Sequence, residues 1–329
     1  MTRPQVNIIV PLFNEEEVFG ELIKRLEQLI ENSKLSIEVI LVDDGSKDST
    51  PLKMRELSLN NGKFHSVILS RNFGHQLALT AGLKYVNATD AVLIIDGDLQ
   101  DPPELLDEFY GYYTKGYDVV YAVRKKRKES VFKRVAYNWF YKFLKRVSYI
   151  DIPLDSGDFS LISVAVVKYL NSMPEESRFL RGMRSWIGFK QIGVEYEREK
   201  RFTGDSKYPF SKLVKLALNG IFNFSEYPIR FISSMGIGII LVSFVYFVSV
   251  ILKKFFFGEV PQGFTALLFM IILFGGIQLL AIGIIGEYIL RIFFQVKNRP
   301  LFITKERIAG KKVQETEPER PVAVYGETE

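Results

Sequence analysis

In the segment AVLIIDGDLQDPPE, residues 91–104, a run of aliphatic residues ends in closely spaced acids. Asp96 and Asp98 are separated by one glycine, which can let the backbone turn so that both carboxylates face one cavity. Two carboxylates and a nearby amide oxygen suit a hard divalent cation, Mg²⁺ or Mn²⁺, which in turn can hold a diphosphate. The spacing therefore predicts a metal and diphosphate site at the end of this segment.

A solvated turn that caps a helix is the alternative for the same segment. The acid Asp101, the two prolines after it and the acid Glu104 stand in the order that favours a helix start. We assign Asp101 and Glu104 to that structural role. It does not explain Asp96, because Asp96 follows five apolar residues and should be poorly hydrated.

Another acid, Asp158, lies in the segment DSGDFSLIS, residues 155–163, after a Ser-Gly turn and before an apolar run of helical character. A short polar side chain in front of such a run suits a helix N-cap. An acid at this place could equally serve as a general base. The residues alone leave both roles open.

Short runs rich in Val and Ile predict five strands in the first part of the chain. Their expected bounds are 6–11, 37–42, 67–70, 91–95 and 118–123. Stretches of helical period, such as EEEVFGELIKRLEQLI and GHQLALTAGLKYV, separate them. Strands that are apolar on both faces and alternate with helices indicate an α/β fold with a largely parallel sheet covered on both sides.

Ligands of such sheets bind beyond the carboxyl ends of the strands, where the chain turns into the next helix. Polar residues collect at these expected turns. They are Asn14 and Glu15 after the first strand, 43–46 after the second, 70–72 after the third and 96–100 after the fourth. The acids of the opening segment are therefore expected at the ligand-binding edge of the sheet.

Basic residues concentrate in two segments, 123–134 and 198–215. A run of charge is most often a solvated surface, and we assign 125–128 to that role or to contact with lipid head groups. Arg124 differs because it closes the fifth expected strand and so points toward the same edge as the acids. Arg201 and Lys207 bracket a Gly-Asp-Ser turn, which suits a loop that closes over phosphates.

His75 lies at an expected helix start, where a capping or packing role is favoured over catalysis. The aromatic residues of 137–144 recur at helical spacing beside a basic run. This pattern favours a helix in the membrane interface over a core helix, and the same argument covers 210–230.

Composition excludes several classes of function. The 329 residues include no cysteine, which removes disulfides, thiolate metal sites and a cysteine nucleophile, and only two histidines, which disfavours a multi-histidine metal site. A net charge of +5 without an Arg-rich run disfavours nucleic acid and favours an anionic membrane surface. The N-terminal residues show no secretory signal pattern, so the front of the chain is expected in the cytoplasm.

Two segments, 231–252 and 264–290, are apolar over the length needed to cross a bilayer. The residues after them carry more positive charge than the loop between them, so both termini are predicted to be cytoplasmic in a multi-pass protein of the plasma membrane. Glycines at 275–276, 283 and 286 allow close helix contact within the hairpin or between subunits, and we expect a homo-oligomer.

Seven segments in order, and the paired hydrophobic C-terminus, carry a family resemblance. They are IIVPLFNEE, VDDGSKDST, SRNFGHQLALTAGL, DGDLQDPPE, DSGDFSLIS, SRFLRGMRSWIG and RFTGDSKYPFSKL. The sequence resembles the family 2 glycosyltransferases, and within them the polyprenyl-phosphate glycosyltransferases typified by dolichyl-phosphate mannose synthase and bacterial bactoprenol glucosyltransferases. The resemblance covers almost everything from residue 6 to residue 299.

The resemblance implies a nucleotide-diphospho-sugar transferase fold of the GT-A, Rossmann-like type. It implies that Asp96, Asp98 and Gln100 hold the metal and the diphosphate of a nucleotide sugar. It also implies contacts with the base and the ribose from Pro11, Asn14, Glu16 and Asp44.

The resemblance further places Asp158 near the acceptor, and Asp98 and Asp158 are the expected catalytic residues. A phosphate acceptor is already ionised at neutral pH, so Asp158 is expected to orient the acceptor or a basic neighbour rather than remove a proton. A lipid phosphate is implied to bind Arg124 with Lys133 or Arg134. A loop that closes over the donor is implied to contain Arg201, Ser206 and Lys207.

The expected activity is inverting, metal-dependent transfer of one sugar, with glucose from UDP-glucose as donor and undecaprenyl phosphate as acceptor. GDP-mannose or an N-acetylated UDP-sugar would require the same chemistry. The rivals are a non-catalytic membrane scaffold that binds nucleotide, and a processive polysaccharide synthase, whose Q-x-x-R-W motif is missing here. The expected regions are a catalytic domain (1–208), an amphipathic interfacial region (209–230), two transmembrane helices (231–295) and a partly disordered cytoplasmic tail (296–329).

Overall fold

A computed structural model describes residues 3–124, 156–197, 227–257 and 263–315 of the chain. The strands in this part are β1 (Val6–Leu12), β2 (Ile37–Asp43), β3 (Phe64–Leu69), β4 (Ala91–Ile94), β5 (Val119–Arg124), β6 (Ser156–Ser163), β7 (Gln191–Tyr196), β8 (Thr304–Ala309) and β9 (Lys312–Gln314). The helices are α1 (Phe19–Asn32), α2 (Thr50–Asn60), α3 (His75–Lys84), the 3₁₀ turn η1 (Pro103–Leu105), α4 (Leu106–Tyr113), α6 (Val164–Ser172), α7 (Leu180–Ile187), α9 (Tyr227–Phe257) and α10 (Phe264–Lys297).

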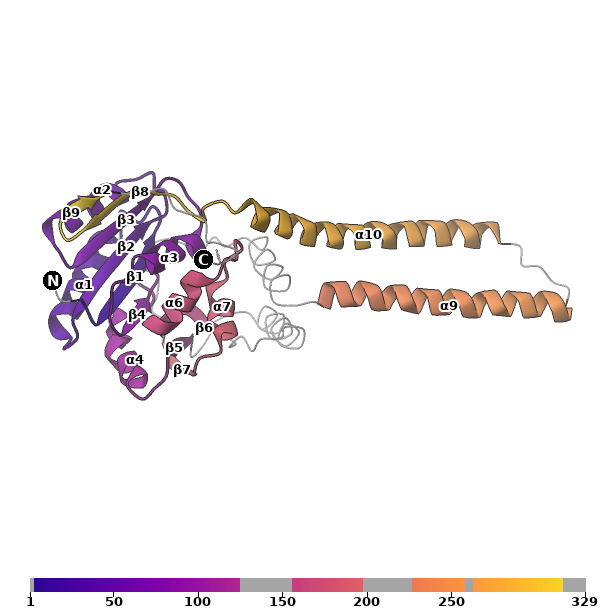
Figure 1. Ribbon diagram of the computed structural model, residues 1–329, viewed down its shortest axis with the longest axis horizontal. Helices are drawn as coiled ribbons and strands as arrows, with labels where there is room; N and C mark the ends of the chain where they lie inside the picture. Colours follow the sequence, from indigo (N-terminus) through magenta and orange to yellow (C-terminus); the bar gives the residue numbers. More distant parts are fainter. Residues whose placement is uncertain (1–2, 125–155, 198–226, 258–262, 316–329) are drawn as a thin grey trace, which may run out of the picture.

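The described strands form one sheet in the order β7-β5-β6-β4-β1-β2-β3-β8-β9 (Figure 1). β1 pairs in parallel with β2 and β4, β2 pairs in parallel with β3, and β5 does so with β7. All five strands predicted from the sequence are present, with ends that shift by a few residues. The expected α/β fold with a mostly parallel sheet is confirmed.

Both faces of the sheet are buried by helices, which explains why the central strands are almost continuously apolar. Ile8 and Val10 of β1 belong to one hydrophobic cluster with α1 and α4, and Ile9 belongs to a second cluster with α3, α6 and α7. Apolar residues of α1 recur three and four positions apart, so one side of the helix can cover the sheet. Successive side chains of β1 point to opposite faces of the sheet, so the strand contributes to both hydrophobic clusters.

β6 differs from the sequence expectation, which placed a helical run after Asp158. The strand runs antiparallel between β4 and β5, and its side chains alternate between the two cores. Phe159 and Leu161 join the cluster under α4, whereas Ile162 joins the cluster under α6. The helix begins only afterwards, and Ser163 is its N-cap, with the Val166 N–H donating to Ser163 Oγ at 3.3 Å.

Two strands, β8 and β9, lie within the tail predicted at 296–329. β8 pairs antiparallel with β3, and β9 pairs with β8, so the sheet extends beyond the predicted 1–208 domain. Ile308 is fully buried and Phe302 nearly so, which ties this segment into the core. Pairing β3 with β8 also satisfies an edge that would otherwise expose backbone hydrogen-bonding groups. Residues 316–329 lie outside the described part of the chain.

α9 and α10 extend side by side away from the sheet (Figure 1). Both are long and apolar enough to cross a membrane, over Tyr227–Val250 and Leu273–Lys297, and neither stretch is buried against the rest of the protein. They correspond to the two segments predicted at 231–252 and 264–290 and are longer than predicted. The interfacial helix predicted at 137–144 lies outside the described residues. So does most of the interfacial region predicted at 209–230, whose last four residues begin α9.

Candidate functional site

Asp96 follows β4 at the carboxyl edge of the sheet, with its side chain 30% exposed. The sequence analysis attributed the turn after it to Gly97, but the residue with a left-handed backbone is Leu99, whose φ is 59°. Gly97 is required for a different reason, since a Cβ there would lie 2.5 Å from Leu12 Cδ2 and 3.0 Å from the Pro11 carbonyl oxygen. The acid pair therefore packs directly against the end of β1.

The residues after Asp98 depart from the predicted solvated cap. The Gln100 N–H donates to Asp98 Oδ1 at 3.2 Å, which fixes the turn. Asp101 is only 2% exposed and accepts a hydrogen bond of 2.6 Å from the Tyr196 hydroxyl on β7. Glu104 is exposed, as expected, and its Oε1 lies 2.6 Å from Arg25 Nε of α1. Asp101 thus links the β4 edge to β7 rather than capping a helix.

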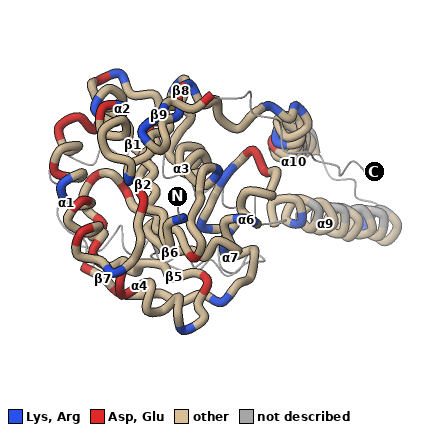
Figure 2. Tube along the Cα trace, turned by 60° about the vertical axis from the view of Figure 1, so that its left-hand side comes forward, with Lys and Arg blue, Asp and Glu red and all other residues tan. Residues whose placement is uncertain are grey.

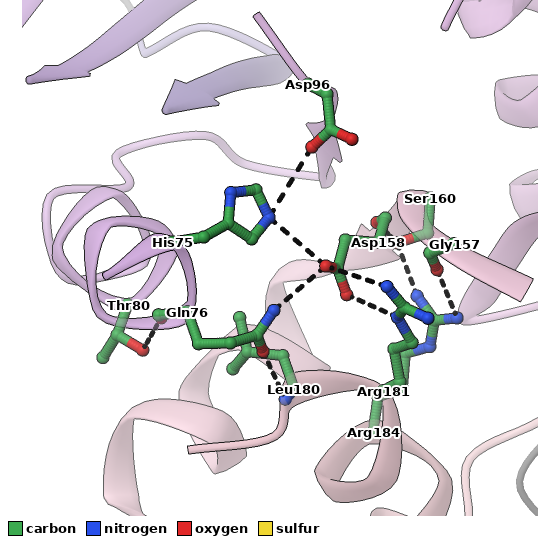
Figure 3. Close-up of polar contacts among 10 residues, drawn as sticks. All are labelled: His75, Gln76, Thr80, Asp96, Gly157, Asp158, Ser160, Leu180, Arg181 and Arg184. Atoms are coloured by element: carbon green, nitrogen blue, oxygen red, sulfur yellow. Dashed lines mark hydrogen bonds and ion pairs between the residues drawn. The ribbon is translucent and has the colours of Figure 1, made fainter. Parts of the chain in front are cut away.

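His75, the first residue of α3, stands between two acids (Figure 3). Its Nε2 lies 3.6 Å from Asp96 Oδ1 and 3.3 Å from Asp158 Oδ2. The His75 side chain is 39% exposed, so it is reachable from outside. The capping or packing role favoured by the sequence does not describe this contact, because the imidazole joins the acids of β4 and β6 across the sheet edge.

Asp158 is buried, with its side chain 7% exposed, and several donors converge on its carboxylate (Figure 3). Arg181 of α7 donates from Nε to Oδ1 at 2.8 Å and from Nη2 to Oδ2 at 3.3 Å. Gln76 Nε2 donates to Oδ2 at 3.0 Å, and Gln76 Oε1 accepts from the Leu180 N–H at 2.9 Å. One glutamine therefore connects α3, the start of α7 and the acid.

Arg184 holds the strand on which Asp158 stands. Its Nη1 donates to Ser160 Oγ at 2.8 Å, and its Nη2 donates to the Gly157 carbonyl at 3.3 Å. Burial lowers the pKa of Arg184 to about 10. The sequence analysis assigned no role to Arg181, Arg184 or Gln76. A usable signal was present, because two arginines three residues apart lie on one side of a helix.

The ionisation of this cluster follows from its mutual contacts. Burial opposes ionisation of Asp158, but the charge of Arg181 and the hydrogen bonds of His75 and Arg181 hold its pKa well below the usual range. Burial likewise opposes protonation of His75, but the hydrogen bond to Asp158 and the charge of Asp96 raise its pKa to about 9. Burial, with the nearby carboxylates of Asp101, Asp158 and Asp98, raises the pKa of Asp96 to about 6, against the attraction of His75.

The acids and amides predicted to surround a base and ribose form the neighbouring part of the same edge. Asn14 has a left-handed backbone, its N–H donates to Ser46 Oγ and its Oδ1 accepts from the Lys47 N–H, both at 2.8 Å. Glu16 accepts from the Ser49 hydroxyl at 2.7 Å, which lowers its pKa. Pro11 is buried in β1. These contacts join the loop after β1 to the loop after β2.

Asp44 accepts from the backbone N–H groups of Phe73, at 2.7 Å, and Gly74, at 3.0 Å. The residue is 4% exposed, and burial raises the pKa of its carboxyl. Because Gly74 directly precedes α3, Asp44 fixes the position at which α3 begins, and with it the position of His75. The structure therefore joins the predicted nucleotide rim to the acid cluster through one carboxylate.

Comparison with known proteins shows the family of this chain. Residues 7–170 match the description "Glycosyl transferase family 2". A relative from Bacillus subtilis (strain 168), named uncharacterized glycosyltransferase YkcC, is 43% identical over 92% of this chain and 94% of its own length. The chain belongs to glycosyl transferase family 2. Another relative of this family 2 glycosyltransferase is the SfII prophage-derived bactoprenol glucosyl transferase of Shigella flexneri. The two are 38% identical over 93% of this chain and 99% of the relative.

A homolog from Escherichia coli (strain K12), named prophage bactoprenol glucosyl transferase homolog, is 37% identical over 92% of this chain and 98% of its own. Among solved structures, the mannosyltransferase PcManGT from Pyrobaculum calidifontis, in complex with GDP-Man and Mn²⁺, aligns over 63% of this chain and 59% of that chain, with a TM-score of 0.44 and 18% identity. The family assignment does not depend on that structural alignment.

The predicted metal ligands of this glycosyltransferase suit a divalent cation. Asp96 and Asp98 supply hard carboxylate oxygens, and Gln100 stands beside them in the same turn. Carboxylates of Asp98, Asp101 and Asp158 gather around Asp96 and help to raise its pKa, so a cation placed among them would favour the ionised form. Within the described residues, no three His, Asp or Glu side chains form a metal site on their own.

Several residues predicted for the site lie outside the described part of this glycosyltransferase. β5 ends at Arg124, which places that residue at the expected edge, but the direction of its side chain is not among the described features. The predicted residues that lie outside the described ranges are Lys133, Arg134, Arg201, Ser206 and Lys207. Their assignments to the lipid phosphate and to the donor loop stay predictions.

Proposed function

We propose that this family 2 glycosyltransferase transfers one glucose from UDP-glucose to a polyprenyl phosphate such as undecaprenyl phosphate, with inversion at the anomeric carbon. The observation that carries the proposal is the 38% identity, over nearly the full length of both chains, to a protein named bactoprenol glucosyl transferase. The acid cluster at the carboxyl edge of the sheet, where α/β folds bind ligands, supports it.

The reaction needs little proton transfer, because the attacking group is an ionised phosphate oxygen. A bond forms between that oxygen and the anomeric carbon while the bond from the anomeric carbon to the nucleotide diphosphate breaks, and the diphosphate leaves with the bonding electrons. Attack from the side opposite the leaving group inverts the configuration. The main task of the protein is therefore to position two anionic groups and to stabilise the departing charge.

Asp158 is proposed as an orienting acid rather than a general base. A carboxylate whose pKa lies well below the usual range is a weak base, and Asp158 already accepts three hydrogen bonds from Arg181 and Gln76. What it provides is the placement of two cations, Arg181 and the protonated His75, at the exposed edge. Those cations are suited to receive phosphate oxygens.

Asp96 and Asp98, with Gln100, would hold Mg²⁺ or Mn²⁺, which when bound neutralises charge on the diphosphate. The neighbouring rim of Pro11, Asn14, Glu16 and Asp44 is proposed to face the nucleoside. The half-exposed His75 ring would then stand between donor and acceptor, since it contacts both the metal-binding acid and the acid assigned to the acceptor.

Membrane insertion through α9 and α10 is part of the proposal, with the catalytic domain and both termini in the cytoplasm. Because the chain lacks cysteine, single cysteines are clean topology reporters. A cysteine at Gln262 should react with an impermeant reagent on intact cells, and one at the exposed Lys312 should not. The opposite pattern would place the sheet on the wrong side for cytosolic nucleotide sugars. Oligomer formation through the helices is a further prediction, tested by crosslinking in membranes.

A donor screen tests the activity. The purified full chain, with undecaprenyl phosphate in detergent, is given UDP-glucose, GDP-mannose and UDP-N-acetylglucosamine in separate reactions, and lipid-linked sugar is measured. UDP-glucose should give the largest kcat/KM, with Glu108→Gln on the exposed side of α4 as a matched control of unchanged activity. A product only from another donor replaces the sugar assignment. Nucleotide binding without any lipid-linked product would support the scaffold alternative instead.

A further inference from the structure

A cavity of about 360 Å³ lies where the domain end of α10 meets α3 and the segment that joins α6 to α7. Charged and polar residues in its lining include Lys84, Asn171, Glu176, Arg178, Gln295 and Arg299. Phe294, Leu301 and Phe302 add an apolar portion. None of these lining residues belongs to the acid cluster described above.

Side-chain contacts with backbone groups hold the walls of this cavity in place. Gln295 Oε1 accepts from the Glu176 N–H at 3.0 Å, and Gln295 Nε2 donates to the Pro174 carbonyl at 2.7 Å. Asn171 Nδ2 donates to the Leu83 carbonyl at 3.0 Å, which joins α6 to α3. Both polar groups of Gln295 are thus used to hold α10 against the α6–α7 segment, so the cavity is a defined feature of the fold.

The charge of the lining favours an anion. Three cations, Lys84, Arg178 and Arg299, surround the space with one acid, Glu176. The charge of Glu175, outside the lining, also acts on Arg178, so the cations still outnumber the acids. Arg178 is 8% exposed and donates to the neutral carbonyls of Met173 and Leu170, both at 2.9 Å, so these hydrogen bonds leave its positive charge in place. Figure 2 shows basic positions between α3 and α6 and near the domain end of α10.

The position of the cavity along the membrane-spanning helix α10 indicates which anion lies near it. The apolar span of this helix is Leu273–Lys297, and its last turns carry the Glu287–Arg291 ion pair, at 3.0 Å, and a Lys297 ammonium 4.1 Å from the Phe293 ring. Basic residues near the end of a membrane span, with aromatic residues beside them, are typical of the level of the lipid head groups. A cavity lined by Phe294 and Gln295 therefore opens at the depth of lipid phosphates.

We propose that this cavity binds the phosphodiester headgroup of an anionic membrane phospholipid. Lys84 and Arg299 contact the phosphate from two sides, and Phe294 and Leu301 contact the glycerol and the first acyl carbons. Basic pockets beside transmembrane helices bind anionic headgroups in this way. A bound headgroup would bridge α3 and the end of α10, and so fix the sheet domain against the membrane.

This lipid site is separate from the proposed acceptor site. His75 and Lys84 are the first and last residues of α3, so they lie about 14 Å apart along the axis at about 1.5 Å per residue. The proposal rests on membrane insertion of α10 but not on the identity of the sugar or of the acceptor. Loss of the lipid site and loss of transferase activity can therefore be told apart by separate measurements.

The test uses the full chain in a neutral detergent, titrated with phosphatidylglycerol or with zwitterionic phosphatidylcholine and followed by native mass spectrometry. One phosphatidylglycerol per chain should be retained in preference to phosphatidylcholine. Lys84→Gln and Arg299→Gln should each weaken its binding about tenfold, since each removes one charge-assisted contact with phosphate. Lys24→Gln, on the exposed side of α1, is the matched control and should change nothing.

Other outcomes overturn the proposal. Equal retention of phosphatidylcholine would show that charge does not select the occupant. Displacement of phosphatidylglycerol by an equal concentration of inorganic phosphate would make the cavity a free-phosphate site, and displacement by polyprenyl phosphate alone would make it part of the acceptor site. Unchanged phosphatidylglycerol binding by the Lys84→Gln, Arg299→Gln double variant would also be decisive against it. Donor binding measured by calorimetry shows that the Gln variants fold. The Lys84→Arg variant keeps the charge and should keep its phosphatidylglycerol binding.

Discussion

The acids after β2 and the acids at the ends of β4 and β6 share one edge of the sheet, but different groups balance their charge. Asp43 and Asp44 accept hydrogen bonds mainly from backbone N–H groups, which cannot titrate. Asp96 and Asp158 face His75 and Arg181 instead. The first arrangement shapes loops, and the second leaves charges that respond to pH and to an anionic ligand.

The two regions also differ in how far their charged groups are exposed to a ligand. The Asp44 carboxylate is buried and fully engaged by the start of α3. The His75 ring and the Asp96 carboxylate are partly exposed, and each has a pKa displaced by neighbouring charges. We therefore expect substitutions in the β4–β6 cluster to affect turnover, and substitutions in the β2 rim to affect folding.

The largest effect is expected from the predicted metal ligands. Asp98→Asn should reduce kcat by roughly a thousandfold or more, because it removes a carboxylate that helps to neutralise the diphosphate. EDTA should silence the wild-type enzyme to a similar degree, and added Mn²⁺ or Mg²⁺ should restore it. Circular dichroism should show that the variant folds. Full activity in EDTA would rule out the metal-dependent mechanism. It would also remove the expected difference in turnover between the β4–β6 cluster and the β2 rim.

Asp158→Asn should lower kcat/KM by roughly a hundredfold, since Arg181 and His75 would lose the charge that places them. Orientation and proton removal make different predictions here. If Asp158 orients cations, the residual activity should keep the wild-type pH dependence on the acid side. Asp107→Asn, at an exposed position of α4, is the matched control. A residual rate that rises tenfold per pH unit would instead indicate that Asp158 acts as a base.

His75→Gln should lower kcat/KM by about tenfold, because one charge-assisted contact with an anionic substrate is lost. The pKa of His75 is raised from 6.5 to about 9, so its stabilising contribution is fully present below about pH 6.5 and is lost as the pH rises through 9. The midpoint temperature of thermal unfolding of the wild type should therefore fall as the pH rises over that window. His75→Gln should remove this fall. Nuclear magnetic resonance of the ring, with His65 as second resonance, measures the pKa directly.

The smallest effect on turnover is expected in the β2 rim. Asp44→Asn should lower the free energy of unfolding by about 2 kcal/mol, because backbone N–H groups of Phe73 and Gly74 lose a charged acceptor. Turnover at saturating donor should stay within about threefold of the wild type, apart from any change in donor KM. A loss of kcat as large as that of Asp158→Asn would erase the distinction between the two regions.

The sequence predicted the elements more fully than the contacts. The five strands and the two long apolar helices follow from runs whose period and length suit them, because both faces of the sheet and all sides of the spans are apolar. β6 was misjudged because FSLIS is too short to distinguish a strand from a helix by period alone. β8 and β9 were assigned to a tail because their polar, charged residues fit an edge hairpin as well as an unfolded segment.

The same limit applied to the site. Asp96, Asp98 and Asp158 stood out as acids at the ends of apolar runs, a signal that local sequence carries. Arg181, Arg184 and Gln76 did not, because their importance depends on a carboxylate far away in the chain. Asp101 was assigned to the wrong environment for the same reason, since its partner is Tyr196 on β7.

The sequence by itself determined the α/β alternation, the edge at which the acids gather and the family to which the chain belongs, because these depend on residue type and spacing along the chain. Only the tertiary structure decided the state of those acids. Asp158 lies between an arginine of α7 and a histidine of α3, and Asp44 lies against the backbone at the start of α3. Burial and the nearest charge set a pKa, and both are properties of residues that meet across the fold rather than along the sequence.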